Sequence, residues 1–235
     1  MDENGVRHRF GARHNHCLTS PIYRRKVAEI NEKLAEHYAD NPAIFAWHVS
    51  NEYNGCCYCE ICAEAFRTYL KKRYNNDLDQ LNHEWWNTFW SHTYTDWKQI
   101  EPPMNIGESR SNSLLINWKR FVTYQTIDFY KNEIESLKRI ASNIPVTTNF
   151  HGDLSDLDYF KFKDSIDFAS WDAYPKWGMP EGDLSEAIKY SFVFDLCRSI
   201  KQKPFLLMES TPSNLCVYNY NKPKRPGVNK ASSLL

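Results

Sequence analysis

Residues 43–52 read AIFAWHVSNE, a short apolar run that ends abruptly at Asn51 and Glu52. Asn41-Pro42 comes just before the run and stops the helical stretch that precedes it. A short apolar run between turn signals is typical of a strand buried in a parallel sheet. The segment therefore predicts a buried strand that delivers a carboxylate at its end.

The same pattern recurs in three later runs, at residues 145–150 (PVTTNF), 166–171 (IDFASW) and 204–208 (PFLLM). Helical stretches are expected between the strands, at residues 20–40, 63–73, 77–90, 114–141, 154–163 and 184–201. A further strand is expected near residues 9–12. Strands that alternate with helices and are apolar throughout predict an α/β fold with a parallel sheet. Polar residues at the strand ends are typical of the active face of a (β/α) barrel.

A doubly wound open sheet is the structural alternative to a barrel. That fold would be expected to carry a phosphate-binding glycine fingerprint, and the chain has only 8 Gly and no such motif. The length of 235 residues allows one large domain or two small ones.

Composition and net charge indicate which classes of binding partner and which cell compartment suit the chain. Lys plus Arg and Asp plus Glu both number 29, so the formal net charge is zero, which argues against a nucleic-acid partner. No apolar run reaches the ~18 residues of a membrane span, and residues 1–16 lack the apolar segment of a signal peptide. The 8 Trp suit a large core or a cleft that stacks on sugar rings. Clustered rather than dispersed cysteines favour a reducing cytoplasm.

Two glutamates stand directly after strands, Glu52 after the first run and Glu209 after PFLLM. Hydrolysis of a glycosidic bond needs one carboxyl group to protonate the leaving oxygen and a second to attack or stabilise the sugar centre. A barrel brings distant strand ends to one rim, so the pair predicts a glycosidase. The alternative is that both are ordinary rim partners of basic side chains.

The cysteines Cys57, Cys59 and Cys62 have tight metal-ligand spacing, and Cys56 could replace Cys57 in the set. Zinc favours four soft ligands in a tetrahedron, so this local trio needs a fourth. Reduced free thiols are the alternative.

The motifs WHVSNEY and LLMEST, together with the cysteine cluster, resemble glycoside hydrolase family 42, the β-galactosidases. The resemblance covers nearly the whole chain and includes FGARHNHC, LNHEWWNTFWSHTY, SWDAYP and the late KRPG. It implies that residues 1–235 form a single, incomplete catalytic (β/α)8 TIM barrel domain. The chain would run from the end of strand 3 through strand 7, with strands 1, 2 and 8 missing.

By this resemblance, Glu52 matches the acid/base and Glu209 the nucleophile of a retaining enzyme that cleaves terminal β-D-galactosides by double displacement. Asn51 matches the residue that bonds the sugar 2-hydroxyl. Tyr174, in SWDAYP, is expected near the nucleophile, as are Asp172 and Trp171 of the same motif.

Two further residues of the sugar site are implied. Arg13, in FGARHNHC, matches an arginine that holds sugar hydroxyls, although alone it reads as a surface residue. Trp90 matches a tryptophan that lines the galactose pocket, with core packing as the alternative. The tryptophan that the family usually places after the nucleophile is missing, because residues 215–218 read LCVY.

The resemblance also supplies Cys17 as the fourth ligand of a structural zinc ion, and it implies a homotrimer for the full-length parent. Because strands are missing, we expect the 235 residues alone to be inactive. Two alternatives stay open at this point: a degenerate, non-catalytic carbohydrate-binding barrel and a zinc-stabilised interaction module.

Overall fold

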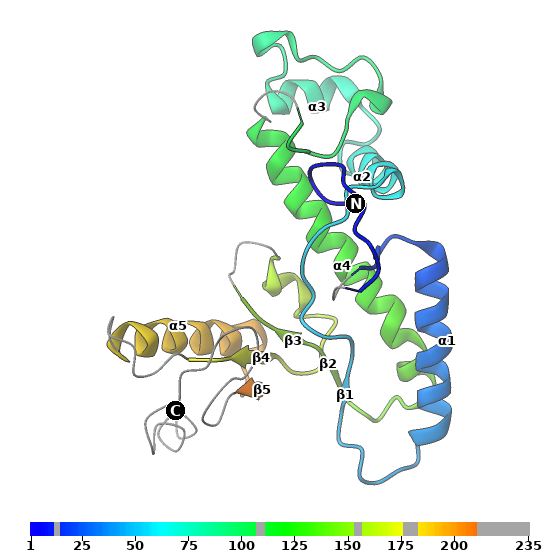
Figure 1. The fold of residues 1–235 in the computed structure, drawn as a ribbon, viewed down its shortest axis with the longest axis vertical. Coiled ribbons are helices and arrows are strands. Elements are labelled where there is room, and N and C mark those ends of the chain that lie inside the picture. The colour runs from blue at the N-terminus through cyan, green and yellow to red at the C-terminus, as the bar shows by residue number, and fades with distance from the viewer. Residues whose placement is uncertain (12–14, 107–110, 153–156, 176–182, 211–235) are drawn as a thin grey trace. The chain divides into compact units, whose positions relative to one another are not determined.

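A computed structural model describes the chain at residues 1–11, 15–106, 111–152, 157–175 and 183–210 (Figure 1). It divides into two compact units between which the chain passes several times. The first unit comprises Met1–Asn41, Asn54–Ser142 and Leu154–Asp158, and the second comprises Pro42–Tyr53, Asn143–Asp153 and Tyr159–Leu235.

The second unit carries the parallel strands. They are β1 (Trp47–His48), β2 (Val146–Thr147), β3 (Asn149–Phe150), β4 (Ser170–Ala173) and β5 (Leu206–Ser210). β1 pairs with β2, and β3, β4 and β5 pair in that order, always in parallel. Only Thr148 separates β2 from β3, so these two short strands form one path along the chain. Parallel neighbours in chain order are the arrangement that successive right-handed crossovers build.

Each of the four apolar runs overlaps such a strand, which confirms the predicted parallel pairing, although the strands are assigned to two sheets, β1-β2 and β3-β4-β5. The strands are shorter than the runs, and β4 starts later than expected. The segment before β4 forms a turn, in which the backbone N–H of Ile166 donates to the carbonyl oxygen of Phe162. Asp167 then bonds Val146 twice, through backbone and side chain. The apolar residues of these strands are buried, as the sequence pattern predicts: Val146, Phe150 and Trp171 are all at most 1% exposed.

Three expected elements differ from the structure. The helix expected at residues 77–90 ends at Trp85, because Trp86 adopts left-handed backbone (φ of 56°). In place of a helix at residues 154–163, the described part contains only the 3₁₀ turn η3 (Tyr159–Phe162), since Tyr159 and Phe162 turn inward to pack on Phe150. No strand is assigned in the described residues before β1, so the strand expected near residues 9–12 is not found there; residue 12 lies outside the described ranges. The helix α5 (Asp183–Lys201) packs on β4 as the crossover to β5.

The first unit is helical. It contains α1 (Pro21–Tyr38), α2 (Glu60–Arg73), α3 (Leu78–Trp85), η1 (Phe89–Ser91), η2 (Trp97–Gln99) and α4 (Asn112–Ile140). Local sequence explains the helix starts: the side chains of Ser20, Asp77 and Ser111 cap α1, α3 and α4 by accepting a backbone N–H from the first turn. α1 lies along α4. Among the described helices, α4 included, none combines the length and apolar character needed to cross a bilayer.

Aromatic packing forms the core of the first unit. Phe66 of α2 is fully buried and meets the ring of Trp118 edge-on, with 5.0 Å between centroids. Phe121 lies 5.4 Å from the same phenylalanine ring. Edge-to-face aromatic pairs add to the gain from burial alone.

We expect Phe66→Ala to lower the free energy of unfolding by about 3–5 kcal/mol, because the lost ring leaves a cavity between α2 and α4. Phe45→Ala is the matched control, since Phe45 is 75% exposed and its removal should cost less than about 0.5 kcal/mol. Urea or thermal unfolding followed by circular dichroism measures both. Equal effects of the two substitutions would contradict this view of the core.

Candidate functional site

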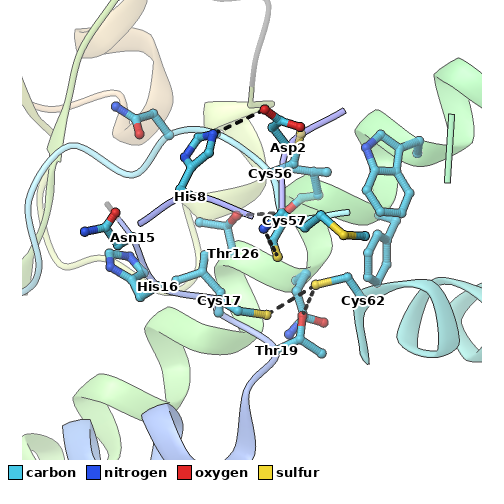
Figure 2. A pocket seen from close by; sticks show the side chains of 18 of the residues that line it. Asp2, His8, Asn15, His16, Cys17, Thr19, Cys56, Cys57, Cys62 and Thr126 are labelled. Carbon is cyan, nitrogen blue, oxygen red and sulfur yellow. Dashed lines mark hydrogen bonds and ion pairs between the residues drawn. The ribbon is translucent and has the colours of Figure 1, made fainter. Parts of the chain in front are cut away.

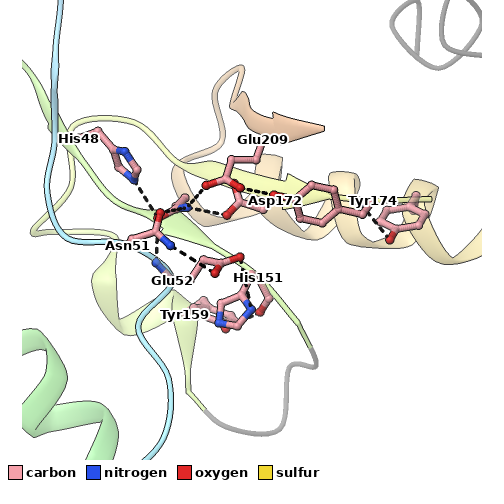
Figure 3. A network of polar contacts seen from close by, with 10 residues as sticks. His48, Asn51, Glu52, His151, Tyr159, Asp172, Tyr174 and Glu209 are labelled. Atoms are coloured by element: carbon pink, nitrogen blue, oxygen red, sulfur yellow. Dashed lines mark hydrogen bonds and ion pairs between the residues drawn. The ribbon is translucent and has the colours of Figure 1, made fainter. Parts of the chain in front are cut away.

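Three carboxylates meet in the second unit. They are Glu52, which follows β1, Asp172 of β4 and Glu209 of β5 (Figure 3). One oxygen of each lies within 4.8 Å of one oxygen of each of the others. The parallel strands end at the same edge, which is why residues so distant in sequence converge there.

Asn149 of β3 lies at the centre of this cluster and is fully buried. Its Oδ1 accepts a hydrogen bond from the backbone N–H of Glu52 at 2.9 Å and lies 2.8 Å from His48 Nε2. The backbone N–H of Glu52 can only donate, so the amide oxygen must face it. This fixes the orientation of the whole carboxamide.

The NH₂ group of Asn149 consequently faces the acidic side chains. Its Nδ2 donates to Asp172 Oδ2 at 2.5 Å, to Asn51 Oδ1 at 3.1 Å and to Glu209 Oε1 at 3.3 Å. Sequence reasoning missed Asn149, although the PVTTNF run offered a signal: an amide side chain inside a strand that is otherwise apolar or hydroxylic.

The backbone at Glu52 is held in an unusual conformation. Glu52 has φ of 46° and Ser50 has φ of 59°, in the left-handed region that non-glycine residues seldom occupy. Such conformations persist where the surroundings hold them, and they concentrate at functional sites. The bond from Glu52 N to Asn149 is one such restraint.

Besides the other two carboxylates, the polar neighbours of the Glu52 carboxylate include Asn51 and His151. Asn51 Nδ2 donates to its Oε2 at 3.2 Å, and His151 Nδ1 lies 3.9 Å from its Oε1. The side chain is only 15% exposed. Asn51 is thus oriented from both ends, since its Oδ1 accepts from Asn149.

Tyr174 donates its hydroxyl hydrogen to Glu209 Oε2. Burial raises the pKa of the Tyr174 phenol, and the hydrogen bond to Glu209 and the charge of Glu209 raise it further. Each oxygen of Glu209 therefore has a neutral donor, Tyr174 on one and Asn149 on the other. Neutral donors stabilise an ionised carboxylate without pairing it to a cation.

Asp172 is 4% exposed. Burial raises the pKa of its carboxyl group to about 7, and the negative charge of Glu209 acts in the same direction. The hydrogen bond from Asn149 opposes the shift without cancelling it.

The other residues expected at a sugar site lie elsewhere in the chain. Trp90 belongs to η1 of the first unit, has φ of 61° and is 77% exposed, so the core-packing alternative is wrong for it. Its ring contacts Phe89 edge-on. Arg13 and residues 215–218 lie outside the described residues.

Four cysteines of the first unit gather in a second cluster. The sulfurs of Cys17, Cys57, Cys59 and Cys62 all lie within 4.8 Å of one another. Three of these residues, Cys17, Cys57 and Cys62, line the pocket drawn in Figure 2. Cys17 Sγ lies 3.4 Å from Cys62 Sγ and 3.8 Å from Cys59 Sγ, and Cys59 Sγ lies 3.8 Å from Cys62 Sγ. Zinc–sulfur bonds of about 2.3 Å in a tetrahedron place sulfurs ~3.8 Å apart, so the donor set and its spacing fit this ion.

The local fold explains how the four thiols meet. Cys59 is the N-cap residue of α2 and Cys62 lies in its first turn, while Cys17 precedes α1. Cys56 is exposed and its sulfur bonds the hydroxyl of Tyr58 at 3.2 Å, outside the cluster. Hydrogen bonds from Cys17 and Cys62 hold the pKa of the Cys57 thiol far below its ordinary value.

Comparison with known proteins gives one consistent family. A family model described as β-galactosidase, of glycoside hydrolase family 42, matches residues 1–235. The β-galactosidase BglY of Alicyclobacillus acidocaldarius is 56% identical over 98% of this chain and 33% of its own length. The β-galactosidase GanA of Bacillus subtilis is 52% identical over 100% of this chain and 36% of its own length.

Solved structures of family 42 β-galactosidases also match the chain. Gan42B, a family 42 β-galactosidase from G. stearothermophilus, superposes with a TM-score of 0.95 at 52% identity, over 99% of this chain and 35% of its own. The chain thus spans about a third of the length of the relatives that it matches. On the match of a family model over its whole length and on these identities, the chain belongs to glycoside hydrolase family 42, a TIM-barrel family of β-galactosidases.

Proposed function

We propose that this chain supplies the catalytic part of a retaining β-galactosidase, with Glu52 as acid/base and Glu209 as nucleophile. The observation that carries the proposal is the approach of the two carboxylates to within 4.8 Å at the edge of the parallel sheet. Retaining glycosidases hold the pair about 5–5.5 Å apart, whereas inverting enzymes leave about 6.5–9.5 Å for a water molecule. Galactose as the substrate follows from the names of the relatives.

In the first step, ionised Glu209 attacks the anomeric carbon while Glu52 donates its proton to the leaving oxygen. The glycosidic bond breaks, a glycosyl ester forms on Glu209, and the aglycone leaves with the proton of Glu52. The hydrogen bonds from Tyr174 and Asn149 hold the nucleophile in place before attack. As neutral donors, they stabilise the ionised carboxylate without pairing it to a cation.

In the second step, Glu52 takes a proton from water, and the resulting oxygen attacks the anomeric carbon. The ester bond breaks and Glu209 leaves as a carboxylate, so configuration at that carbon is retained overall. The charge has moved from Glu209 to Glu52 and back. Two carboxylates this close exchange their roles without both being charged at once.

Asn51 is proposed to bond the sugar 2-hydroxyl, a contact that strengthens at the transition state. Its side chain is already oriented by Asn149 and Glu52. Arg13 is proposed to hold sugar hydroxyls, and Trp90 to line the galactose pocket. The exposure of Trp90 leaves its ring available for stacking.

The chain is proposed to correspond to the end of strand 3 through strand 7 of the family barrel, with β1 as the first described strand of the series. The homotrimer implied by the resemblance and the cytoplasmic location favoured by the clustered cysteines are proposals of the same kind.

The cysteine cluster is proposed to hold a structural zinc ion bound by Cys17, Cys57, Cys59 and Cys62. Four thiolates complete a tetrahedron and leave no open position for substrate or water. The ion would tie the segment before α1 to the start of α2.

We expect Glu209→Ala and Glu52→Ala, in a protein of the relatives' full length, to lose most turnover of nitrophenyl-β-galactoside. Loss of an acid/base group costs about 10²–10⁴-fold, and loss of the nucleophile abolishes the ester pathway. The matched control is Glu135→Ala, because Glu135 is exposed on α4. Equal rates for Glu209→Ala and the control would end the nucleophile assignment, and sugar binding without turnover by the unaltered protein would favour a non-catalytic barrel.

We expect the 235 residues expressed alone to show no galactosidase activity, because a third of the relatives' length leaves parallel strands without neighbours. The comparison is the same assay on a protein of the relatives' length, with size-exclusion chromatography to compare aggregation. A monodisperse, active 235-residue protein would contradict the expectation.

We expect about one zinc ion per chain, which Cys57→Ser should remove and Cys56→Ser should leave in place. The contrast follows from the structure, since only Cys57 of this pair lies in the thiol cluster. Metal content by mass spectrometry and thermal unfolding measure the two effects together. Zinc loss in Cys56→Ser alone would reverse the ligand assignment, and no zinc in the unaltered protein would remove the site.

A further inference from the structure

Asp172 lies between the two proposed catalytic carboxylates and has no role in the steps above. Its oxygens approach those of Glu52 and Glu209 to within 4.8 Å. Neither Asp172 nor Glu209 forms an ion pair with any other described residue. Three negative charges in so small a space would repel one another strongly, because the buried setting screens them poorly.

The two oxygens of Asp172 have different surroundings. Oδ2 accepts from Asn149 at 2.5 Å, whereas Oδ1 is buried and has no hydrogen-bond partner among the described residues. A buried charged oxygen without a partner is costly, and a protonated carboxyl group avoids most of that cost. Asp172 as a whole is 4% exposed, so water compensates little.

We propose that Asp172 is a positioning residue that remains uncharged in the resting site, with its proton on Oδ1, so that Glu209 is the single negative charge of the cluster. This inference rests on the proposed function of Glu52 and Glu209. An uncharged Asp172 accepts from Asn149 through Oδ2, and Asn149 in turn reaches Glu209 Oε1. Asp172 thereby shares one amide group with the nucleophile without competing with it for charge.

The titratable groups around Asp172 come from every neighbouring strand. His48 lies in β1 and Glu52 follows it. His151 follows β3, Tyr174 follows β4, and Glu209 lies in β5. The charge of Glu209 works with burial to raise the pKa of Asp172, and the charge of Glu52 adds to it. Asn149 is the neutral donor that works against them.

Ionisation of Asp172 would change the site. A second negative charge in the cluster would oppose the loss of a further proton from it, which extends the alkaline limb of activity. Asp172→Asn keeps the size and the neutral state but cannot ionise. Its amide can still meet Asn149 through the oxygen that replaces Oδ2.

The test compares pH profiles of kcat/KM for the unaltered full-length protein, Asp172→Asn and the control Asp164→Asn, whose side chain is exposed. We expect Asp172→Asn to keep activity within about tenfold at acidic pH and to shift its alkaline limb to lower pH. Asp164→Asn should follow the unaltered profile. A loss above about 100-fold at every pH would show that the charge of Asp172 is required, and an unchanged profile would show that Asp172 does not influence Glu52; either result overturns the proposal.

Infrared spectroscopy of the unaltered protein with ¹³C-labelled aspartate tests the proton directly and needs neither turnover nor a folded variant. We expect a protonated aspartyl C=O band at pH about 5.5 that is lost by pH about 8.5, on either side of a pKa of about 7. Absence of the band at the lower pH would overturn the proposal even if Glu52 and Glu209 prove catalytic. Presence of the band in an inactive protein would instead mean that the proposed function alone had failed.

Discussion

The orientation of one buried carboxamide, that of Asn149, governs the polar arrangement of the site. Because its oxygen must face the backbone N–H of Glu52, its NH₂ group must face Asp172, Glu209 and Asn51. Reversal of the amide would bring two donors together on one side and acceptors together on the other, at a cost that buried groups cannot recover from water. A single backbone bond therefore determines which way the donors of the site point.

The parallel sheet makes this arrangement available. Glu52, Asn149, Asp172 and Glu209 come from four strand segments, and each is separated from the next by a crossover or a turn. Parallel pairing in chain order places the equivalent ends of the strands together, whatever the length of chain between them. The left-handed backbone at Ser50 and Glu52 then redirects the chain just where its carboxylate is needed.

The sequence predicted the strands and the two glutamates because both depend on local patterns: an apolar run of strand length, followed at once by a polar residue. It also singled out the three clustered cysteines through their spacing. It did not predict Asn149 as a central residue, since one polar residue in a buried strand has no period or spacing to mark it. Asp172 is expected near the nucleophile only through the family resemblance of the SWDAYP motif. The helix expected at residues 154–163 failed for a related reason. The apolar residues Tyr159 and Phe162 satisfy a helical pattern, yet they turn inward to pack on Phe150 from a single 3₁₀ turn. Tertiary packing decided that segment, and local propensity did not.

The thiol cluster and the carboxylate cluster belong to different compact units. The proposed role of the first is to stabilise the fold, and that of the second is to transfer protons. Every sulfur of the thiol cluster comes from the first unit, whereas every described carboxylate, amide and phenol of the polar network comes from the second. Thiolates saturate a tetrahedral ion and leave it no vacancy for a water or a sugar oxygen, so an ion held there acts through the stability of the segment before α1 and the start of α2. Proton transfer, in contrast, depends on how many charges the three carboxylates share within a few ångströms. In the proposed mechanism, burial and the neutral donors Asn149 and Tyr174 govern how the three carboxylates share that charge.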